Sequence, residues 1–297
     1  MLLVLDIGNT NMVVGVYQKD KLLEHWRLET KKERTSDEFG IFLKELFQFS
    51  KLDLEQIQSV VISSVVPPLE FAIERMCQRY LKLKPLWVTA TTKTPIKIKL
   101  DHPKELGADR IVNAVAGFKK YGGPLIIVDF GTATTFDYID AKGNYLGGMI
   151  APGISISNEA LFEKASKLPH VEIRKPPRAI GKNTIDSMQA GIFYGYIGMV
   201  DEIVRRITQE AKVKKINVVA TGGFTSLILP ESKTIKKADP FLTLEGLKMI
   251  WEGQNLKSIK ETQLLISNNK FMKGFLRARS EIKSKQTVSS KKLFRNK

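Results

Sequence analysis

Apolar positions near the start of the chain fall into short runs separated by turn residues. Leu2–Leu5 is the first run, Asp6–Asn11 supplies turn residues, and Met12–Tyr17 is again apolar and β-branched. Two such runs around a polar turn predict a β-hairpin. Leu22–Leu28 continues the pattern, so we expect a third strand in the same meander.

Further along, stretches with helical spacing alternate with short apolar runs. Ser36–Phe49 carries an apolar stripe at helical intervals, and Ser36 is its candidate N-cap. Other helices are predicted from Pro67-Pro68 to about Leu81 and over residues 111–121, 155–165, 186–211 and 244–253. Further strands are predicted over residues 60–66, 86–89, 125–128, 136–139, 144–150 and 217–220.

The opening pattern recurs in the middle of the chain. Asp129-Phe130-Gly131-Thr132 follows an apolar run as Asp6-Ile7-Gly8-Asn9 does, and the two copies lie 123 residues apart, since Asp129 is the counterpart of Asp6. A repeat at roughly half the globular length indicates two related halves. We therefore predict a duplicated α/β fold with one half at residues 1–115 and the other at residues 116–255.

Composition places the chain among globular proteins. It has 297 residues, of which 43% are hydrophobic and 26% charged, enough to bury a sizeable core. No run of eighteen apolar residues occurs, and Asp6 interrupts the apolar start, so neither a transmembrane helix nor a signal peptide is expected. The single cysteine, Cys77, excludes an intramolecular disulfide and a Cys-based zinc site. We expect a buried, inert thiol and a cytoplasmic protein.

The net charge of +16 suggests a polyanionic partner until its distribution is considered. Residues 256–297 contain twelve Lys or Arg against two Glu, which leaves only +6 for residues 1–255. The body of the protein is therefore only mildly basic. For residues 256–297 we favour a solvated, mostly disordered extension over a segment that binds nucleic acid or anionic lipid.

The two Asp-x-Gly turns are candidate phosphate sites. A glycine lets the main-chain N–H groups approach an anion closely, whereas the carboxylate of Asp6 or Asp129 would repel a bare phosphate. A cation between the carboxylate and the phosphate resolves this conflict and points to a nucleoside triphosphate. Each turn could also be an ordinary hairpin turn, but two copies together with Thr221-Gly222-Gly223 favour a binding function.

A second candidate site lies at the start of the helix predicted from Ile111. Asp109 and Arg110 would project from its N-terminus, where an Asp can orient or deprotonate a hydroxyl beside an Arg that binds phosphate or carboxylate. Phosphoryl transfer needs such a pair. A capping Asp next to a solvated Arg is the equally weighted alternative.

Five motifs in this order and spacing resemble those of type III pantothenate kinases, from Met1 to about Gly253. They are Asp6-Ile7-Gly8-Asn9-Thr10-Asn11, Gly107-Ala108-Asp109-Arg110, Asp129-Phe130-Gly131-Thr132-Ala133-Thr134-Thr135, Gly147-Gly148-Met149-Ile150-Ala151-Pro152-Gly153 and Gly181-Lys182-Asn183-Thr184. The resemblance implies duplicated ribonuclease H-like (actin-like ATPase) halves with the nucleotide in the cleft between them. It also implies transfer of the ATP γ-phosphoryl group to the hydroxyl of pantothenate, the first step of coenzyme A synthesis.

The resemblance further implies a role for individual residues. Asp109 matches the proposed catalytic base, Asp129 the ligand of a monovalent cation (K⁺ or NH₄⁺), and Thr132 a second ATP contact. Mg²⁺ is implied as well, and Thr184 matches a substrate contact that the partner subunit of a homodimer supplies. The implied ATP-binding residues are Asp6, Ile7, Gly8, Asn9, Thr10, Asn11, Met12 and Val13, and the implied pantothenate-binding residues are Gly107, Ala108, Asp109 and Arg110.

One position departs from the family pattern. Many members have an aromatic residue whose phenol contacts pantothenate just upstream of the Gly107 motif, but this chain has Leu100, followed by Asp101-His102-Pro103. Leu100 has no phenol for that contact.

The alternative to an enzyme is an ATP-binding regulator or a nucleic-acid-binding protein on the same scaffold, with the basic tail as its contact. Asp109 argues for the enzyme, because a sensor needs no base.

Overall fold

The computed structural model describes residues 1–267, with side chains described for residues 1–255. Residues Met1–Trp251 form one compact unit. Its first sheet has the order β3-β2-β1-β4-β5, in which β1 pairs antiparallel with β2 and parallel with β4. The strands are β1 (Leu2–Ile7), β2 (Asn11–Gln18), β3 (Lys21–Glu29), β4 (Ser59–Ser64) and β5 (Leu86–Trp87). The predicted meander is confirmed.

The second sheet repeats this topology. Its order is β11-β10-β7-β8-β9-β6, and β7 pairs antiparallel with β8 and parallel with β10, as β1 does with β2 and β4. The strands are β6 (Lys97–Ile98), β7 (Leu125–Phe130), β8 (Ala133–Ile139), β9 (Asn144–Pro152), β10 (Asn217–Gly222) and β11 (Lys237–Ala238). The molecule is thus an α/β protein with duplicated ribonuclease H-like halves. The short strands β6 and β11 were not predicted. The boundary predicted between residues 115 and 116 falls within the helix at Ala108–Tyr121. The division into two domains stays a prediction.

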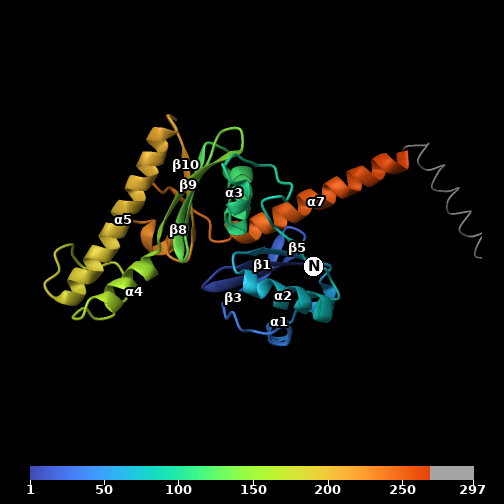
Figure 1. Cartoon of the computed structure of the whole chain (residues 1–297), viewed down its shortest axis with the longest axis horizontal. Helices are drawn as coiled ribbons and strands as arrows, with labels where there is room; N and C mark the ends of the chain where they lie inside the picture. Colours follow the sequence, from blue (N-terminus) through green and yellow to red (C-terminus); the bar gives the residue numbers. More distant parts are fainter. Residues whose placement is uncertain (268–297) are drawn as a thin grey trace, which may run out of the picture. The chain divides into compact units, whose positions relative to one another are not determined.

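The helices cover the sheets much as the periodicity predicts (Figure 1). They are α1 (Ser36–Phe49), α2 (Pro67–Met76), α3 (Ala108–Tyr121), α4 (Ile154–Lys164), α5 (Thr184–Glu210), α6 (Thr225–Ile228) and α7 (Leu242–Ser267), with short helical turns at Leu54–Gln56, Cys77–Leu81 and Pro103–Glu105. Cys77–Leu81 is a π-helical continuation of α2, and Cys77 is buried, as expected; burial raises the pKa of its thiol to about 12.

Two helix ends differ from prediction. The N-cap of α1 is Thr35 rather than Ser36, because Thr35 and Glu38 form a capping box in which each side chain accepts from the other's backbone N–H. The last helix, α7, continues past Gly253 to Ser267, so residues 256–267 of the predicted disordered tail are helical. The rest of that tail, residues 268–297, lies outside the described residues.

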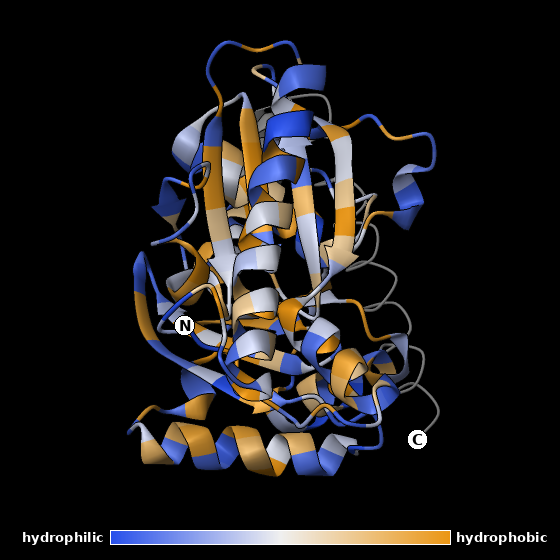
Figure 2. Cartoon of the chain, turned by 90° about the vertical axis from the view of Figure 1, so that its left-hand side faces the viewer, coloured by the Kyte–Doolittle hydropathy of each residue, from blue (hydrophilic) through white to orange (hydrophobic). Residues whose placement is uncertain are grey.

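Alternate residues of each central strand face two different cores. Leu3, Leu5 and Ile7 of β1 pack with residues of α1 and α2, whereas Leu2 and Val4 face α3 and α7. The strand β7 repeats this arrangement, with one face against α5 and the other against α3. In Figure 2 the strands are accordingly rich in hydrophobic residues, whereas outer turns and helix ends are hydrophilic.

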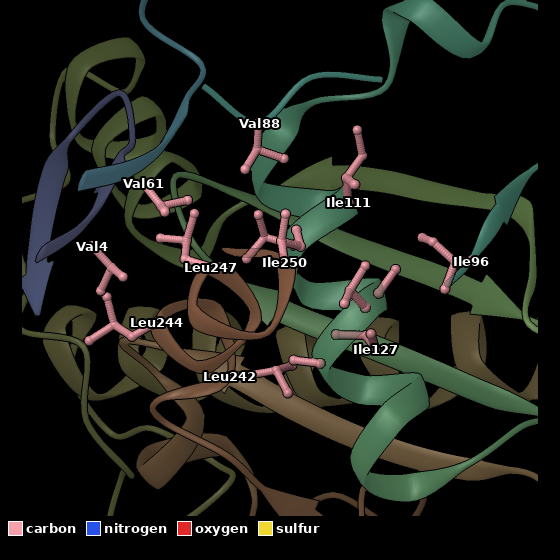
Figure 3. Close-up of a cluster of buried hydrophobic side chains, with 14 of the residues drawn as sticks. Val4, Val61, Val88, Ile96, Ile111, Ile127, Leu242, Leu244, Leu247 and Ile250 are labelled. Atoms are coloured by element: carbon pink, nitrogen blue, oxygen red, sulfur yellow. The ribbon is translucent and has the colours of Figure 1, made fainter. Parts of the chain in front are cut away.

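The core between the two sheets joins the halves of the molecule. Figure 3 shows Val4 and Val61 of the first sheet, Ile127 of the second, Ile111 of α3 and Leu247 of α7 converging there. Complete burial of a large aliphatic side chain contributes about 1.5–3 kcal/mol, so this shared core fixes α3 and the start of α7 against both sheets. No helix in the described part of the chain has the length and apolar character that a membrane span requires.

Candidate active site

The two Asp-x-Gly turns face the same cavity, which has a volume of about 320 Å³. Asp6, Gly8, Asn9, Thr10, Asn11 and Val13 line it from the first half, and Asp129, Gly131 and Thr132 line it from the second. Asp109 of α3 and the predicted Thr221-Gly222-Gly223 turn complete the polar wall. The Thr10 and Thr132 hydroxyls lie 2.7 Å apart and form a hydrogen bond between the two turns. Residues 122 positions apart in the sequence therefore meet at one site.

Asp6 is the penultimate residue of β1 and lies opposite Ser63 in the parallel pairing with β4. The Ser63 hydroxyl donates a short hydrogen bond to Asp6 Oδ1. Burial raises the pKa of Asp6 to about 7, and the Ser63 hydrogen bond opposes that shift. The negative charge of Asp109 raises it further, so these two carboxylates interact across the cavity.

Asp129 is the penultimate residue of β7, as Asp6 is of β1, and the amide Nδ2 of Asn113 donates to its Oδ2 at 2.9 Å. Burial raises the pKa of Asp129 to about 7, and the charges of Asp109 and Asp6 add to that effect. Three carboxylates that repel one another around one cavity favour a cation or a proton between them. In the described part of the chain, however, no three His, Cys, Asp or Glu side chains form a metal site by themselves. A cation here would need ligands from a substrate as well.

Asp109 lies in the first turn of α3, as predicted, and its Oδ1 accepts the backbone N–H of Arg110 at 2.8 Å. Burial raises its pKa, whereas the hydrogen bond from that N–H and the charge of Arg110 lower it. A carboxylate whose pKa is raised is a stronger base than an ordinary aspartate, which suits a general base for a hydroxyl.

Arg110 is neither solvated nor directed into the cavity. Its Nε and Nη2 both donate to Oδ1 of Asp137, at 2.7 and 2.6 Å. The side chain of Asp137 is fully buried and also accepts the Tyr145 hydroxyl at 2.5 Å. Gly107 and Ala108 likewise do not line the cavity; Gly107 is the N-cap of α3 and Ala108 is buried. Gly107, Ala108 and Arg110 therefore flank Asp109 in the sequence without lining the cavity.

The remaining predicted site residues lie elsewhere. Ile7 and Met12 are buried in the core between the first sheet and α1 and α2, so only their backbones could contact a nucleotide. Thr184 begins α5 and borders a separate surface pocket with Ser166–Pro169, Asn183 and Ile185. Leu100 packs against the core between the two sheets, near Gly147 of β9.

Several residues of the site were not predicted, and three of them concern its charge or its hydrogen bonds. Arg27 of β3 is the only Arg or Lys among the described residues that line the cavity, Thr243 of α7 also lines it, and Asn113 of α3 holds Asp129. None belongs to a glycine-rich turn. A signal was present only for Asn113, which lies four residues after Asp109 and hence on the same face of α3.

A duplicated ribonuclease H-like fold whose two phosphate-type turns and three carboxylates meet in one cavity defines an ATP-dependent phosphotransferase of the actin-like class. The family model for type III pantothenate kinase matches residues 2–206. The chain belongs to the type III pantothenate kinase family, and its activity is that of an ATP-dependent pantothenate kinase.

Individual relatives agree with this assignment. The chain is 57% identical to a type III pantothenate kinase from Geobacter sulfurreducens over 85% of this chain and 98% of that one. It is 54% identical to a type III pantothenate kinase from Bacillus cytotoxicus over 85% of this chain and 96% of that one. Among solved structures, a Baf family protein from Campylobacter jejuni has the same fold, with a TM-score of 0.54 at 18% identity, covering 85% of this chain and 98% of that one.

Proposed function

We propose that this kinase holds the triphosphate of ATP between the turns Asp6–Val13 and Asp129–Thr132 and activates the substrate hydroxyl with Asp109. The observation that carries the proposal is that Asp109 lines the same cavity as both turns. A nucleophile held beside Asp109 would therefore face a phosphate held by the turns. Positioning of this kind, together with charge neutralisation, accounts for most of the rate of phosphoryl transfer.

The reaction forms a bond between the primary hydroxyl oxygen of pantothenate and the γ-phosphorus of ATP. The bond from that phosphorus to the β–γ bridging oxygen breaks, ADP leaves, and Asp109 accepts the hydroxyl proton. The product is 4'-phosphopantothenate, so the reaction is the first step of coenzyme A synthesis. Because burial raises the pKa of Asp109, its carboxylate is a stronger base than an exposed aspartate.

The carboxylates fit two cations, Mg²⁺ and a monovalent ion (K⁺ or NH₄⁺). Asp6 and Asp129 are partly buried, and the strongest influences on the pKa of Asp129 include no cationic side chain. Mg²⁺ is commonly bound by one or two carboxylates plus substrate phosphates, so the absence of a closed cluster among the described residues suits it. When bound, the ions neutralise charge on the phosphates. We assign the monovalent ion to Asp129.

Pantothenate would lie against Gly107–Arg110, with Thr184 supplied by the partner subunit of a homodimer. Thr184 is exposed and outside the ATP cavity of its own chain, which supports a contact from a second copy. Leu100 offers no phenol hydroxyl to this substrate. A regulatory or nucleic-acid-binding function is not favoured, because the family is enzymatic. The cytoplasmic location stays a prediction based on the single cysteine.

Replacement of the base tests the mechanism directly. We expect Asp109→Asn to lower kcat by about 100-fold or more, because a positioned general base typically contributes 10²–10⁴-fold. The measurement is ADP release that depends on both ATP and pantothenate, with and without KCl. ATP-induced thermal stabilisation should persist in the variant, because the phosphate turns are unchanged.

Asp101→Asn is the matched control, since Asp101 is an exposed aspartate in the nearby loop. Its turnover should equal that of the wild type. Wild-type turnover in Asp109→Asn would show that another group takes the proton.

A further inference from the structure

The hydrogen bond from Asn113 to Asp129 is one of two consecutive hydrogen bonds. Asn113 lies in α3 with a fully buried side chain, and its Oδ1 accepts the Thr243 hydroxyl at 2.8 Å. Thr243 lies in the first turn of α7 and borders the ATP cavity. Three elements distant in the sequence, β7, α3 and α7, therefore contribute consecutive links.

When the Asp129 carboxylate is ionised, as a cation ligand must be, the donors and acceptors of these two hydrogen bonds allow only one arrangement. An ionised carboxylate has no proton to give, so Asn113 must turn its NH₂ group toward Asp129. Its carbonyl oxygen then faces Thr243, whose hydroxyl must donate. Without that hydroxyl, a buried amide oxygen would lose its partner and the amide would be free to rotate away from Asp129.

The other carboxylate oxygen, Oδ1 of Asp129, lies close to Gly222 at the end of β10, where a side chain would also collide with the Phe130 main chain. Gly222 has φ +91°, and a Cβ at this position would lie 2.6 Å from Oδ1. Any side chain here would collide with the carboxylate as well as strain the backbone. The glycine therefore keeps space beside Oδ1, while Asn113 holds Oδ2.

We propose that Asn113 and Thr243 are positioning residues that hold the Asp129 carboxylate with Oδ1 directed to the monovalent cation. The inference rests on the cation site assigned to Asp129 in the proposed function. It gives α7 a part in the site, because its first turn fixes the amide that orients the ligand. Residues behind a metal ligand commonly affect metal affinity in this way.

Thr243→Val tests the chain of hydrogen bonds, because valine keeps the shape of threonine and lacks the hydroxyl. We expect the KCl concentration at half-maximal effect to rise about 5-fold, as the loss of one hydrogen bond worth about 1 kcal/mol implies. This midpoint is measured in two ways: by turnover and, with ADP present, by thermal stabilisation. Choline chloride keeps the ionic strength constant in both titrations.

Two further variants separate positioning from a general loss of stability. Thr243→Ser restores the hydroxyl and should return the KCl midpoint to that of the wild type. Thr208→Val removes a hydroxyl that bonds only the Val204 carbonyl within α5, and it should not move the midpoint.

The possible results are distinct. A raised midpoint in both titrations, reversed by Thr243→Ser, supports the proposal. An unchanged midpoint in Thr243→Val, with KCl dependence intact in the wild type, overturns the positioning role alone. A wild type that shows no KCl dependence in either titration overturns the cation assignment at Asp129, and this inference with it.

Discussion

Among the residues that the structure describes, Arg27 is the one cationic side chain on a cavity wall that also carries three carboxylates. It reaches the site from β3, where it pairs in register with Val13 of the first phosphate turn. The positive charge of Arg27 lowers the pKa of Asp6, so its electrostatic influence reaches the cavity. A triphosphate brings negative charge to the same space, so Arg27 is the side chain best placed to bind it.

We predict that Arg27→Met raises the KM for ATP about 10-fold or more, because a hydrogen bond to a charged group contributes about 1.5–3 kcal/mol. The KM for pantothenate should stay the same. Steady-state kinetics with each substrate varied in turn make the measurement, and Lys21→Met, at the exposed start of the same strand, is the control. Equal KM values for ATP in Arg27→Met and wild type would exclude this contact.

At single positions, the sequence predicts what depends on local chemistry. The Asp6 and Asp129 turns were predictable because strand, carboxylate and glycine are adjacent in the chain. Arg27 and Thr243 were not, since only the pairing of strands and the packing of α7 bring them to the cavity. The Thr35 cap was predictable from its spacing to Glu38, but the adjacent Ser36 is an equally good capping residue type.

At the level of elements, α3 organises the site. Its first turn carries Asp109 and Arg110, and Asn113 follows on the same face as Asp109. The helix is held by the core between the sheets and by the ion pair from Arg110 to Asp137 of β8. Tyr145 of β9 donates to the same Asp137 oxygen, so three elements share one buried charge pair.

We predict that Asp137→Asn lowers the free energy of unfolding by about 3 kcal/mol or more, because loss of one partner leaves the other charge buried and uncompensated. The KM for pantothenate should rise, since Arg110 is part of the proposed binding segment, whereas the KM for ATP should not. Urea denaturation and steady-state kinetics give these quantities.

Tyr145→Phe is the graded comparison for this pair. It removes one neutral donor from the charged Asp137 and should cost about 1.5–3 kcal/mol with a smaller effect on the KM for pantothenate. If Asp137→Asn unfolds at lower urea but keeps the wild-type KM for pantothenate, the ion pair stabilises the fold without placing Arg110 for the substrate.

At the scale of the whole molecule, the repeat of strand, Asp-x-Gly and strand was enough to predict duplication. The strand order was not predictable, because nothing local specifies that β4 and β10 insert parallel to β1 and β7. The length of α7 was not predicted either. The apolar spacing ends at Gly253, but the helical backbone continues to Ser267. Thr184 shows a different limit, because its proposed role depends on a second chain.

The surface around Thr184 has the character expected of an interface between copies. Ile185, which lines the same surface pocket as Thr184, is 49% exposed, and Ile180, four residues before Thr184 in the chain, is 82% exposed. Exposed apolar residues that gather on one surface commonly mark a protein contact. In the proposed homodimer, Thr184 of one copy contacts the pantothenate bound to the other copy.

We predict that Ile185→Arg converts the dimer to a monomer in analytical ultracentrifugation and abolishes pantothenate-dependent ADP release. ATP-induced thermal stabilisation should be retained, because Ile185 does not line the ATP cavity. Phe71→Arg makes the same kind of change at a 72%-exposed position on α2 and should alter neither property. A monomeric Ile185→Arg with full turnover would show that no residue from a partner is needed, and Thr184 would lose its proposed role. A monomeric wild type would instead remove the dimer itself.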